Sequence, residues 1–407
     1  SILSISCTIT GMNKYVLSIA LLVASTGAFA QNRLVKKAQG LINNNQIEEA
    51  QTLLTEALNS GETKDMALAW DVQGDLYQRL FADELNKAAA HQPLDTAKFA
   101  KNLYACLDAY EKCNEYDEKK EYAEKNKGNL MKFRTFLMYV GQFDFQNQNF
   151  AGAYKAYDAW LTYPQNHKLV ADEPKVLNDS VFDKNQVAYY ACLAAYQGKD
   201  FDKVATHLEE ALKYDKEAKT VKQLHLMTLL EKGDTAQWVD ASKKYAVADE
   251  VIAQNLLAYY TEKKNDAASL EFANSLLAAD PNNKIANYSK GVVLFGQEKF
   301  EEALPFFEKS AEIDPTFTDA YYNAGVCCCN TGYGINEAIG KTKNMKKAEY
   351  DKEIEKVKSW YKKAEPFFLK VKELEPDNPQ RWASRLKTVY YITGEKAKEA
   401  EMDTYLK

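Results

Sequence analysis

Small and apolar positions recur along the chain with a helical period, and one complete unit of the pattern lies between two prolines. The pair Asp280-Pro281 recurs as Asp314-Pro315, and Gly291, Ala303 and Phe307 lie between the two pairs. This spacing predicts two helices joined by a turn. The small residues let the two helices approach closely, and Phe307 fills the gap between neighbouring units. Each proline ends one helix and starts the next.

The same arrangement recurs elsewhere. One unit carries Gly141 followed by Ala153, Tyr157 and Trp160, and another has Cys192 in place of the glycine. Cysteine is small enough to keep the approach of the two helices close. A pattern that repeats along the chain is a stronger indication than any single match.

Two further units match the period in length but depart from it in composition. Residues 219–250 and 251–283 carry Leu226 and Leu257 at the glycine position. A leucine side chain there removes the space that a close helix approach needs, so the packing of these two units stays open on the sequence alone.

The repeated unit resembles the tetratricopeptide repeat. Trp70, Gly74 and Tyr77 match the first-helix pattern W-x3-G-x2-Y of that family, and residues 50–57 match its second helix. The resemblance extends from about residue 32 to a capping segment at 382–407. The residues that define the repeats are Trp70, Gly74, Tyr77, Gly141, Ala153, Tyr157, Gly291, Ala303, Phe307, Pro315, Gly325, Ala364, Phe368 and Pro376. The resemblance implies an all-α, right-handed superhelical solenoid of about 7–8 helix-turn-helix repeats.

Three insertions interrupt the period. Residues 80–96 and residues 331–358 are each predicted to split one repeat, and residues 164–183, which contain Pro174, read as an exposed loop. Insertions of this kind gather on one face and often serve binding, and the alternative is that all three are tolerated elaborations of the surface. We assign residues 31–250 to an N-terminal set of repeats and residues 251–407 to a C-terminal set.

First helices line a concave groove in the tetratricopeptide family, and the matching positions of this chain are the candidate binding residues. They are aromatic and amide-rich, which suits a segment with apolar and polar parts or a sugar ring. The alternative is that several of the tyrosines only pack between helices. The positions are Met138, Gln142, Phe145, Gln146, Tyr189, Leu193, Tyr196, Gln197, Tyr288, Val292, Phe295, Tyr322, Val326 and Asn330.

The resemblance therefore implies a non-enzymatic scaffold or adaptor that binds a protein or peptide in the groove. The lysine and asparagine clamp of the family's chaperone-docking members is absent. The alternative is a glycan-binding protein of the outer-membrane nutrient-uptake type. That class is typically longer and anchored by a lipid on a cysteine. No cysteine stands where the signal peptide described below is expected to be cleaved, before Gln31.

Composition agrees with a folded helical chain. The 407 residues are 46% hydrophobic and 27% charged, with only 17 glycines and 9 prolines, too few for a many-stranded sandwich. A formal charge of −6 disfavours nucleic acid as a partner. Seven cysteines in so large a chain do not indicate a disulfide framework, and the run 327–329 lacks the second cluster that a zinc site needs.

The N-terminal segment has the features of a secretory signal peptide. Met12-Asn13-Lys14 gives a positive start, residues 16–28 an apolar run, and Ala28-Phe29-Ala30 a cleavage site before Gln31. The run is about half the ~20 residues that span a bilayer, so no membrane span is expected in the mature chain. We expect an exported protein of the bacterial envelope, periplasmic or peripheral to the outer membrane, and residues 1–11 lie upstream of the predicted start.

No catalytic, cofactor or metal constellation is recognised. The four histidines are scattered, and no H-E-x-x-H arrangement exists. Gly334 to Thr342 resembles a P-loop but has five residues between its glycines where four are required. The lysine-rich stretch 341–363 alternates with acidic residues, which predicts an exposed helical hairpin with side-chain pairs three or four apart and leaves contact with an anionic envelope component open.

Overall fold

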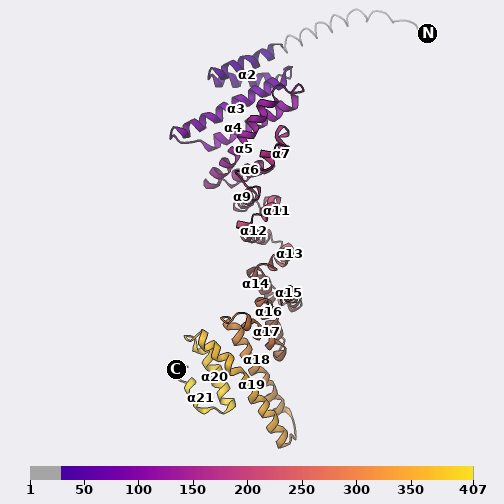
Figure 1. Cartoon of the computed structure of the whole chain (residues 1–407), viewed down its shortest axis with the longest axis vertical. Coiled ribbons are helices and arrows are strands. Elements are labelled where there is room, and N and C mark those ends of the chain that lie inside the picture. Colours follow the sequence, from indigo (N-terminus) through magenta and orange to yellow (C-terminus); the bar gives the residue numbers. More distant parts are fainter. Residues whose placement is uncertain (1–28, 407) are drawn as a thin grey trace, which may run out of the picture. The chain divides into compact units, whose positions relative to one another are not determined.

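The computed structural model of the chain describes residues 29–406, which are helical with no strand among them. The all-α prediction is confirmed. The chain divides into two compact units, one ending at Gly233 and one beginning at Asp234. Figure 1 labels helices of both units. The domain bounds assigned from the sequence, with the change after residue 250, stay a prediction.

The first unit begins with a helix over residues 29–43. It continues with α2 (Ile47–Asn59), α3 (Met66–Ala89), α4 (Thr96–Tyr116), α5 (Ala123–Gln146), α6 (Phe150–Leu161), α7 (Tyr163–Asn166), the 3-10 turn η1 (Lys168–Val170), α8 (Pro174–Leu177), α9 (Lys184–Gln197), α10 (Phe201–Val204), η2 (Ala205–His207), α11 (Leu208–Ala211), η3 (Asp215–Glu217) and α12 (Ala218–Glu231).

The second unit is formed by α13 (Thr235–Ala246), α14 (Glu250–Glu262), α15 (Asp266–Ala279), α16 (Lys284–Gly296), α17 (Phe300–Ile313), α18 (Thr318–Lys341), α19 (Lys347–Leu374), α20 (Pro379–Thr393) and α21 (Lys396–Met402). Consecutive helices pack as pairs within each unit. Asp314 and Glu375, which precede Pro315 and Pro376, are the C-caps of α17 and α19, so the prolines follow the helix ends as predicted.

Each glycine of the repeat pattern lies against an aromatic ring of the second helix. A methyl group added at Gly291 would lie 2.8 Å from the ring of Phe307, and one added at Gly325 would lie 2.7 Å from that of Phe368. Gly141 stands in the same relation to Tyr157. The sequence predicts Phe307 in the gap between neighbouring repeats. Its ring also fills the space beside Gly291, the glycine of its own repeat. The glycines are required by packing, because their φ angles are helical.

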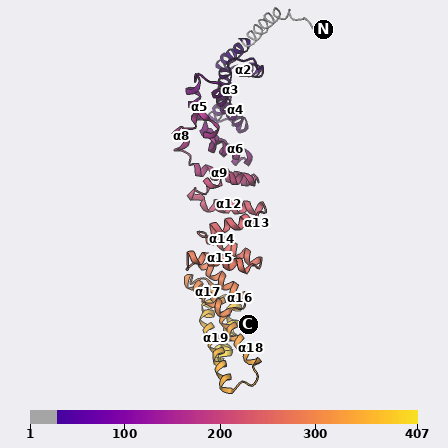
Figure 2. The ribbon, with the colours of Figure 1, turned by 90° about the vertical axis from the view of Figure 1, so that its right-hand side faces the viewer.

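The two split repeats keep this contact across their insertions. Gly74 lies against the ring of Tyr110, and Gly325 lies against that of Phe368. In both pairs the separation along the sequence is more than twice that of an uninterrupted repeat. The additional residues lengthen α3 with α4 and α18 with α19, which lie side by side as long hairpins (Figure 2). The insertions at 80–96 and 331–358 are thus helical extensions of intact repeats.

The hairpin of α18 and α19 carries the charge pairs expected from the sequence. Lys356 pairs with Glu353 at 2.6 Å and Lys358 with Glu355 at 3.2 Å. Residues 334–341 of the P-loop-like stretch lie inside α18, so they form helix where a phosphate loop would be needed.

The third insertion differs from the expected exposed loop. Residues 164–183 contain α8, η1 and most of α7, and Val170 and Val176 are buried in the core of the first unit. The presence of Pro174 predicts a loop for this segment. Its short helical turns instead carry apolar side chains that pack the segment against α5.

In the unit that carries Leu257 in place of glycine, the large and the small side chain have changed places between the two helices. Residue 273 takes the place of the ring, because it follows Leu257 at the same separation as Tyr157 follows Gly141, and it is alanine. Both Leu257 and Ala273 are buried, and their helices α14 and α15 pack together. A large side chain on the first helix and a small one on the second replace the glycine and ring, so the packed volume is kept.

A residue with positive φ marks the turn of six helix pairs, and it follows the small or glycine-equivalent position by seven residues in each. Its φ lies between 52° and 69° at every one of these turns. The residues are Asn45, Gln148, Lys199, Gly233, Lys264 and Glu298. Lys264 has this spacing within residues 251–283, so the register assigned to that unit from the sequence is confirmed. Gly233 has the same spacing but lies at the boundary of the two compact units, so the packing of residues 219–250 as one repeat stays a prediction. The handedness of the superhelix stays a prediction.

Replacement of Glu298 by glycine is expected to stabilise its repeat by about 0.5–1 kcal/mol, because glycine adopts the left-handed conformation without strain and only part of the gain is lost to the unfolded chain. Amide hydrogen exchange of α16 and α17 measures the local free energy of opening. Glu302→Gly, at an exposed position within α17, is the matched control and should destabilise. A destabilising Glu298→Gly would contradict the strained turn.

The predicted capping segment forms a last helix pair, α20 and α21. Trp382 is buried, and its indole N–H donates to the carbonyl of Glu375 at 3.1 Å. Among the described helices none has the length and apolar content needed to cross a membrane. Apart from residues 29–30, the predicted signal peptide and the residues before it lie outside the described part of the chain.

Candidate functional site

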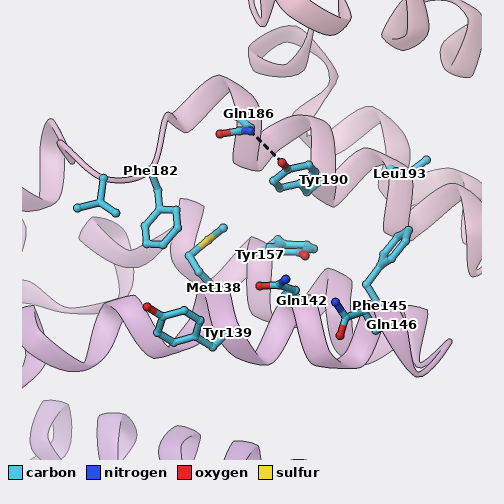
Figure 3. A pocket seen from close by; sticks show the side chains of 11 residues that line it. Met138, Tyr139, Gln142, Phe145, Gln146, Tyr157, Phe182, Gln186, Tyr190 and Leu193 are labelled. Atoms are coloured by element: carbon cyan, nitrogen blue, oxygen red, sulfur yellow. Dashed lines mark hydrogen bonds between the residues drawn. The ribbon is translucent and has the colours of Figure 1, made fainter.

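A cavity of about 480 Å³ opens between the first helices α5 and α9 of two successive repeats in the first unit. We call it the α5–α9 groove. Side chains of α5, of α6, of the segment 181–182 and of α9 line it (Figure 3). They are Met138, Tyr139, Gln142, Phe145, Gln146, Tyr157, Val181, Phe182, Gln186, Tyr190 and Leu193.

Helical periodicity brings these side chains together. Met138, Gln142 and Phe145 are spaced i, i+4, i+7 and therefore share one face of α5. Residues 186, 190 and 193 have the same spacing on α9. In Figure 3 the first set rises from α5 toward Tyr190 and Leu193, with Tyr157 between the two helices. Tyr157 reaches this place because Gly141 leaves room for its ring.

None of the eleven lining side chains is charged. Burial raises the pKa of Tyr157 to about 12, so its hydroxyl stays neutral at physiological pH. Gln186 donates to the hydroxyl of Tyr190 at 2.8 Å. The side chains of Gln142 and Gln146 are exposed, and their amide groups form no hydrogen bond with another described residue. The groove thus offers aromatic and aliphatic surface with two free amide groups.

The structure places the predicted groove residues of the first unit in two environments. Met138, Gln142 and Phe145, with Gln146 and Leu193, line the α5–α9 groove. Tyr189, Tyr196 and Gln197 do not line it. The ring of Tyr189 lies against Tyr214 at 6.0 Å, that of Tyr196 lies against Phe201 at 5.7 Å, and Gln197 is exposed at the end of α9.

The groove also contains residues that the family positions do not indicate. Helix α9 lines the cavity with the face turned toward the preceding repeat, so Gln186 and Tyr190 take the place of Tyr189 and Tyr196. Val181 and Phe182 come from the third insertion, which no repeat template covers. The available signal in the sequence was the i, i+4, i+7 pattern of 186, 190 and 193, which matches that of 138, 142 and 145.

The second unit has a separate cavity of about 490 Å³ between α14 and α16, which Tyr288 and Val292 line. Tyr288 is largely engaged within the fold, because its ring lies 4.7 Å from that of Phe317 and its hydroxyl accepts a hydrogen bond from Asn323. This cavity also carries the acidic side chains of Glu262 and Asp319.

The remaining predicted groove residues of the second unit do not join that cavity. The ring of Phe295 lies against Phe300 at 5.1 Å, and Asn330 borders a shallower hollow beside α17. Tyr322 lies under the guanidinium of Arg381, and its hydroxyl accepts a hydrogen bond from Arg385 at 3.0 Å. Val326 is buried.

Two of the histidines lie in structural contacts. Nε2 of His207 lies 2.7 Å from the carboxylate of Asp158, and Nδ1 of His167 lies 3.8 Å from that of Glu111. Among residues 29–406 no group of three or more His, Cys, Asp or Glu side chains could hold a metal ion. The cysteines of the described part are buried, and burial raises the pKa of the Cys328 thiol to about 12.

No family model matches the chain, and no curated protein matches it. Solved structures are similar to it at low identity. The C-terminal part of a TPR repeat-containing protein from Cytophaga hutchinsonii is 14% identical with a TM-score of 0.37, over 65% of this chain and 92% of that one. YrrB, a TPR protein with an unusual peptide-binding site, is 18% identical with a TM-score of 0.29, over 54% of this chain and 96% of that one.

The TPR domain of P58(IPK) is 12% identical with a TM-score of 0.27, over 90% of this chain and 99% of that one. Within this chain, the glycine–ring contacts of Gly141 and Gly291 and the constant spacing of the turns confirm the resemblance to the tetratricopeptide repeat at the level of the fold.

Proposed function

We propose that this protein is a non-enzymatic interaction scaffold that binds an uncharged, extended peptide segment of a partner protein in the α5–α9 groove. The observation that carries the proposal is the lining of the groove, which is aromatic and aliphatic, contains no charge and presents the free amides of Gln142 and Gln146. Apolar side chains of a segment would gain from burial there, at about 25 cal/mol per Å² of apolar surface. A charged side chain would lose hydration without finding a counter-ion.

The two free amides suit an extended backbone. Gln142 and Gln146 are one helical step of four residues apart, about 6 Å along α5. In an extended peptide, residues i and i+2 face the same side and are about 6.6 Å apart. Each amide can therefore donate to one peptide carbonyl and accept from one N–H of alternate residues. The stretch of α5 from Met138 to Gln146 is about 12 Å long, which corresponds to roughly four residues of ligand.

A glycan is the alternative ligand, and the groove supports it less. Sugar hydroxyls that lose water need hydrogen-bond partners, and each one left without a partner costs about 1–3 kcal/mol. The hydroxyl of Tyr190 already receives the Gln186 donor, and the apolar wall of Val181, Phe182 and Leu193 offers none. A peptide with apolar side chains makes fewer such demands.

The test is a selection from a random dodecapeptide display library on the immobilised full chain, run beside an oligosaccharide panel. We expect enriched peptides to lack charge over about four consecutive positions and to carry apolar residues at alternate ones. No enrichment, or enrichment of charged cores, would overturn the proposal. Saturable binding of an oligosaccharide without peptide enrichment would support the glycan alternative instead.

The location of this activity is part of the proposal. The signal-peptide features of residues 12–30 lead us to propose an exported protein of the bacterial envelope, with a periplasmic or membrane-peripheral partner. Fusion of the N-terminal segment, from Ser1 to Gly40, to a reporter that is active only after export tests this. An inactive reporter in a bacterial host would count against it.

A further inference from the structure

We propose that Asp179, held by the buried Arg134, positions Val181 and Phe182 as one wall of the α5–α9 groove and so determines which segments the groove accepts. The part that concerns ligand choice rests on the proposed function. The part that concerns the wall rests on the contacts of the 164–183 insertion alone.

Arg134 is the buried anchor of this arrangement. The residue is 4% exposed, and it lies on α5 one turn before the groove residue Met138. Its Nη1 donates to the carbonyl of Val176 at 2.9 Å, and its Nη2 donates to that of Trp160 at 3.1 Å. The guanidinium carbon lies 3.8 Å from the centre of the Trp160 ring. These contacts tie α5, α6 and α8 together around one charge.

Asp179 connects this anchor to the groove wall. One carboxylate oxygen, Oδ2, lies 3.4 Å from Nη1 of Arg134. The other, Oδ1, accepts hydrogen bonds from the backbone N–H of Val181 at 2.8 Å and of Phe182 at 3.0 Å. Burial lowers the pKa of Arg134 and the Asp179 carboxylate opposes this effect, so the guanidinium stays charged.

The wall residues need this support to different degrees. The ring of Phe182 packs edge-on against Trp160 at 6.3 Å. Val181 is 75% exposed, so its place at the groove does not come from packing. The hydrogen bond from its own backbone to Asp179 is what fixes it. Without the Asp179 carboxylate, Val181 should therefore lose its fixed position. Phe182 should lose one hydrogen bond but keep its packing against Trp160.

Other contacts hold the earlier part of the insertion independently. Lys127 pairs with Glu173 at 2.5 Å, and the hydroxyl of Tyr163 donates to the carbonyl of Leu130 at 2.7 Å. Both connect the insertion to α5 before residue 174. Asp183 caps the start of α9 through the N–H of Asn185 at 2.8 Å. Loss of the Asp179 contacts should therefore affect only the stretch 181–182, which faces the groove.

The first measurement is hydrogen exchange of the full chain with Asp179→Ala. We expect the amides of Val181 and Phe182 to exchange at least about tenfold faster, because each loses its acceptor, while α9 is unchanged. Asp179→Asn keeps an acceptor oxygen and should restore most of the protection. Glu173→Gln is the matched control and should leave these two amides as they are. Unchanged exchange in Asp179→Ala would overturn the positioning of the wall.

The second measurement separates positioning from general stability by a double-mutant cycle, with the most enriched peptide of the selection as a synthetic probe. Asp179→Ala should weaken its binding about tenfold in the wild-type background, yet less than about twofold in Val181→Ala/Phe182→Ala, where no wall side chains remain to be positioned. Equal losses in both backgrounds would mean that Asp179 acts only through stability, and the specificity role would be refuted.

The outcomes distinguish the two proposals. If no peptide binds the wild-type chain, the proposed function fails, and the exchange of Val181 and Phe182 still decides whether Asp179 positions the wall. If peptides bind and Asp179→Ala releases both amides without changing affinity, the proposed function stands and the role of Asp179 in ligand choice is overturned.

Discussion

Gly291→Leu is expected to destabilise the repeat of α16 and α17 by about 1–3 kcal/mol, since a single carbon added at Gly291 already meets the ring of Phe307 at 2.8 Å. The ring cannot retreat freely, because Phe307 is fully buried and Tyr288 packs on it at 5.5 Å. Hydrogen exchange over residues 284–313 should report the loss locally, as expected of an array in which each repeat is held mainly by its neighbours.

A second substitution tests the cause. The chain already contains the reversed arrangement, with buried Leu257 on the first helix and Ala273 on the second. Gly291→Leu/Phe307→Ala should therefore be more stable than Gly291→Leu alone, although Phe307→Ala by itself removes a buried ring. Additive losses would show that the clash between these two positions is not the origin of the effect.

Gln142→Glu is expected to weaken peptide binding by at least about tenfold while leaving the fold unchanged. The two side chains have nearly the same shape, and Gln142 is exposed in the free protein. The bound segment would cover the new carboxylate in a groove without any cationic lining residue, and burying an unpaired charge is costly. Calorimetric titration of the enriched synthetic peptide measures the change.

Gln197→Glu is the matched control for this effect. Gln197 is also an exposed glutamine of a first helix and was a candidate from its family position, yet it does not line the groove. Its replacement adds the same net charge and should change the affinity less than about twofold. Added salt should reduce this remaining change further, because it screens the long-range interaction of the new carboxylate with the peptide. Equal weakening by both substitutions would mean that long-range charge, and not the groove, governs binding.

Much of the fold follows from local rules that a single sequence contains. The contact of a glycine with a ring at a fixed separation is visible in Gly141 with Tyr157, and the size of each insertion follows from where the ring next appears. The exchange at Leu257 and Ala273 was equally present in the sequence. It was missed because the family template looks for glycine and does not compare the two positions as a pair.

The site was only partly predictable, for a physical reason. Positions on α5 follow from the repeat template, and Met138, Gln142 and Phe145 line the groove as expected. The opposite side depends on the rotation of α9 and on the 164–183 insertion. Arg134 fixes that insertion through contacts with Val176 and Asp179, which are far from it in the sequence and which no period encodes.

The central claim is that ligand binds between α5 and α9, and the most direct measurement is hydrogen exchange of the full chain with and without the enriched synthetic peptide. The account predicts added protection in residues 138–146 and 181–193, and none in α14 and α16 of the second unit. Protection confined to α14 and α16, or a bound peptide that protects neither part of the α5–α9 groove, would contradict it.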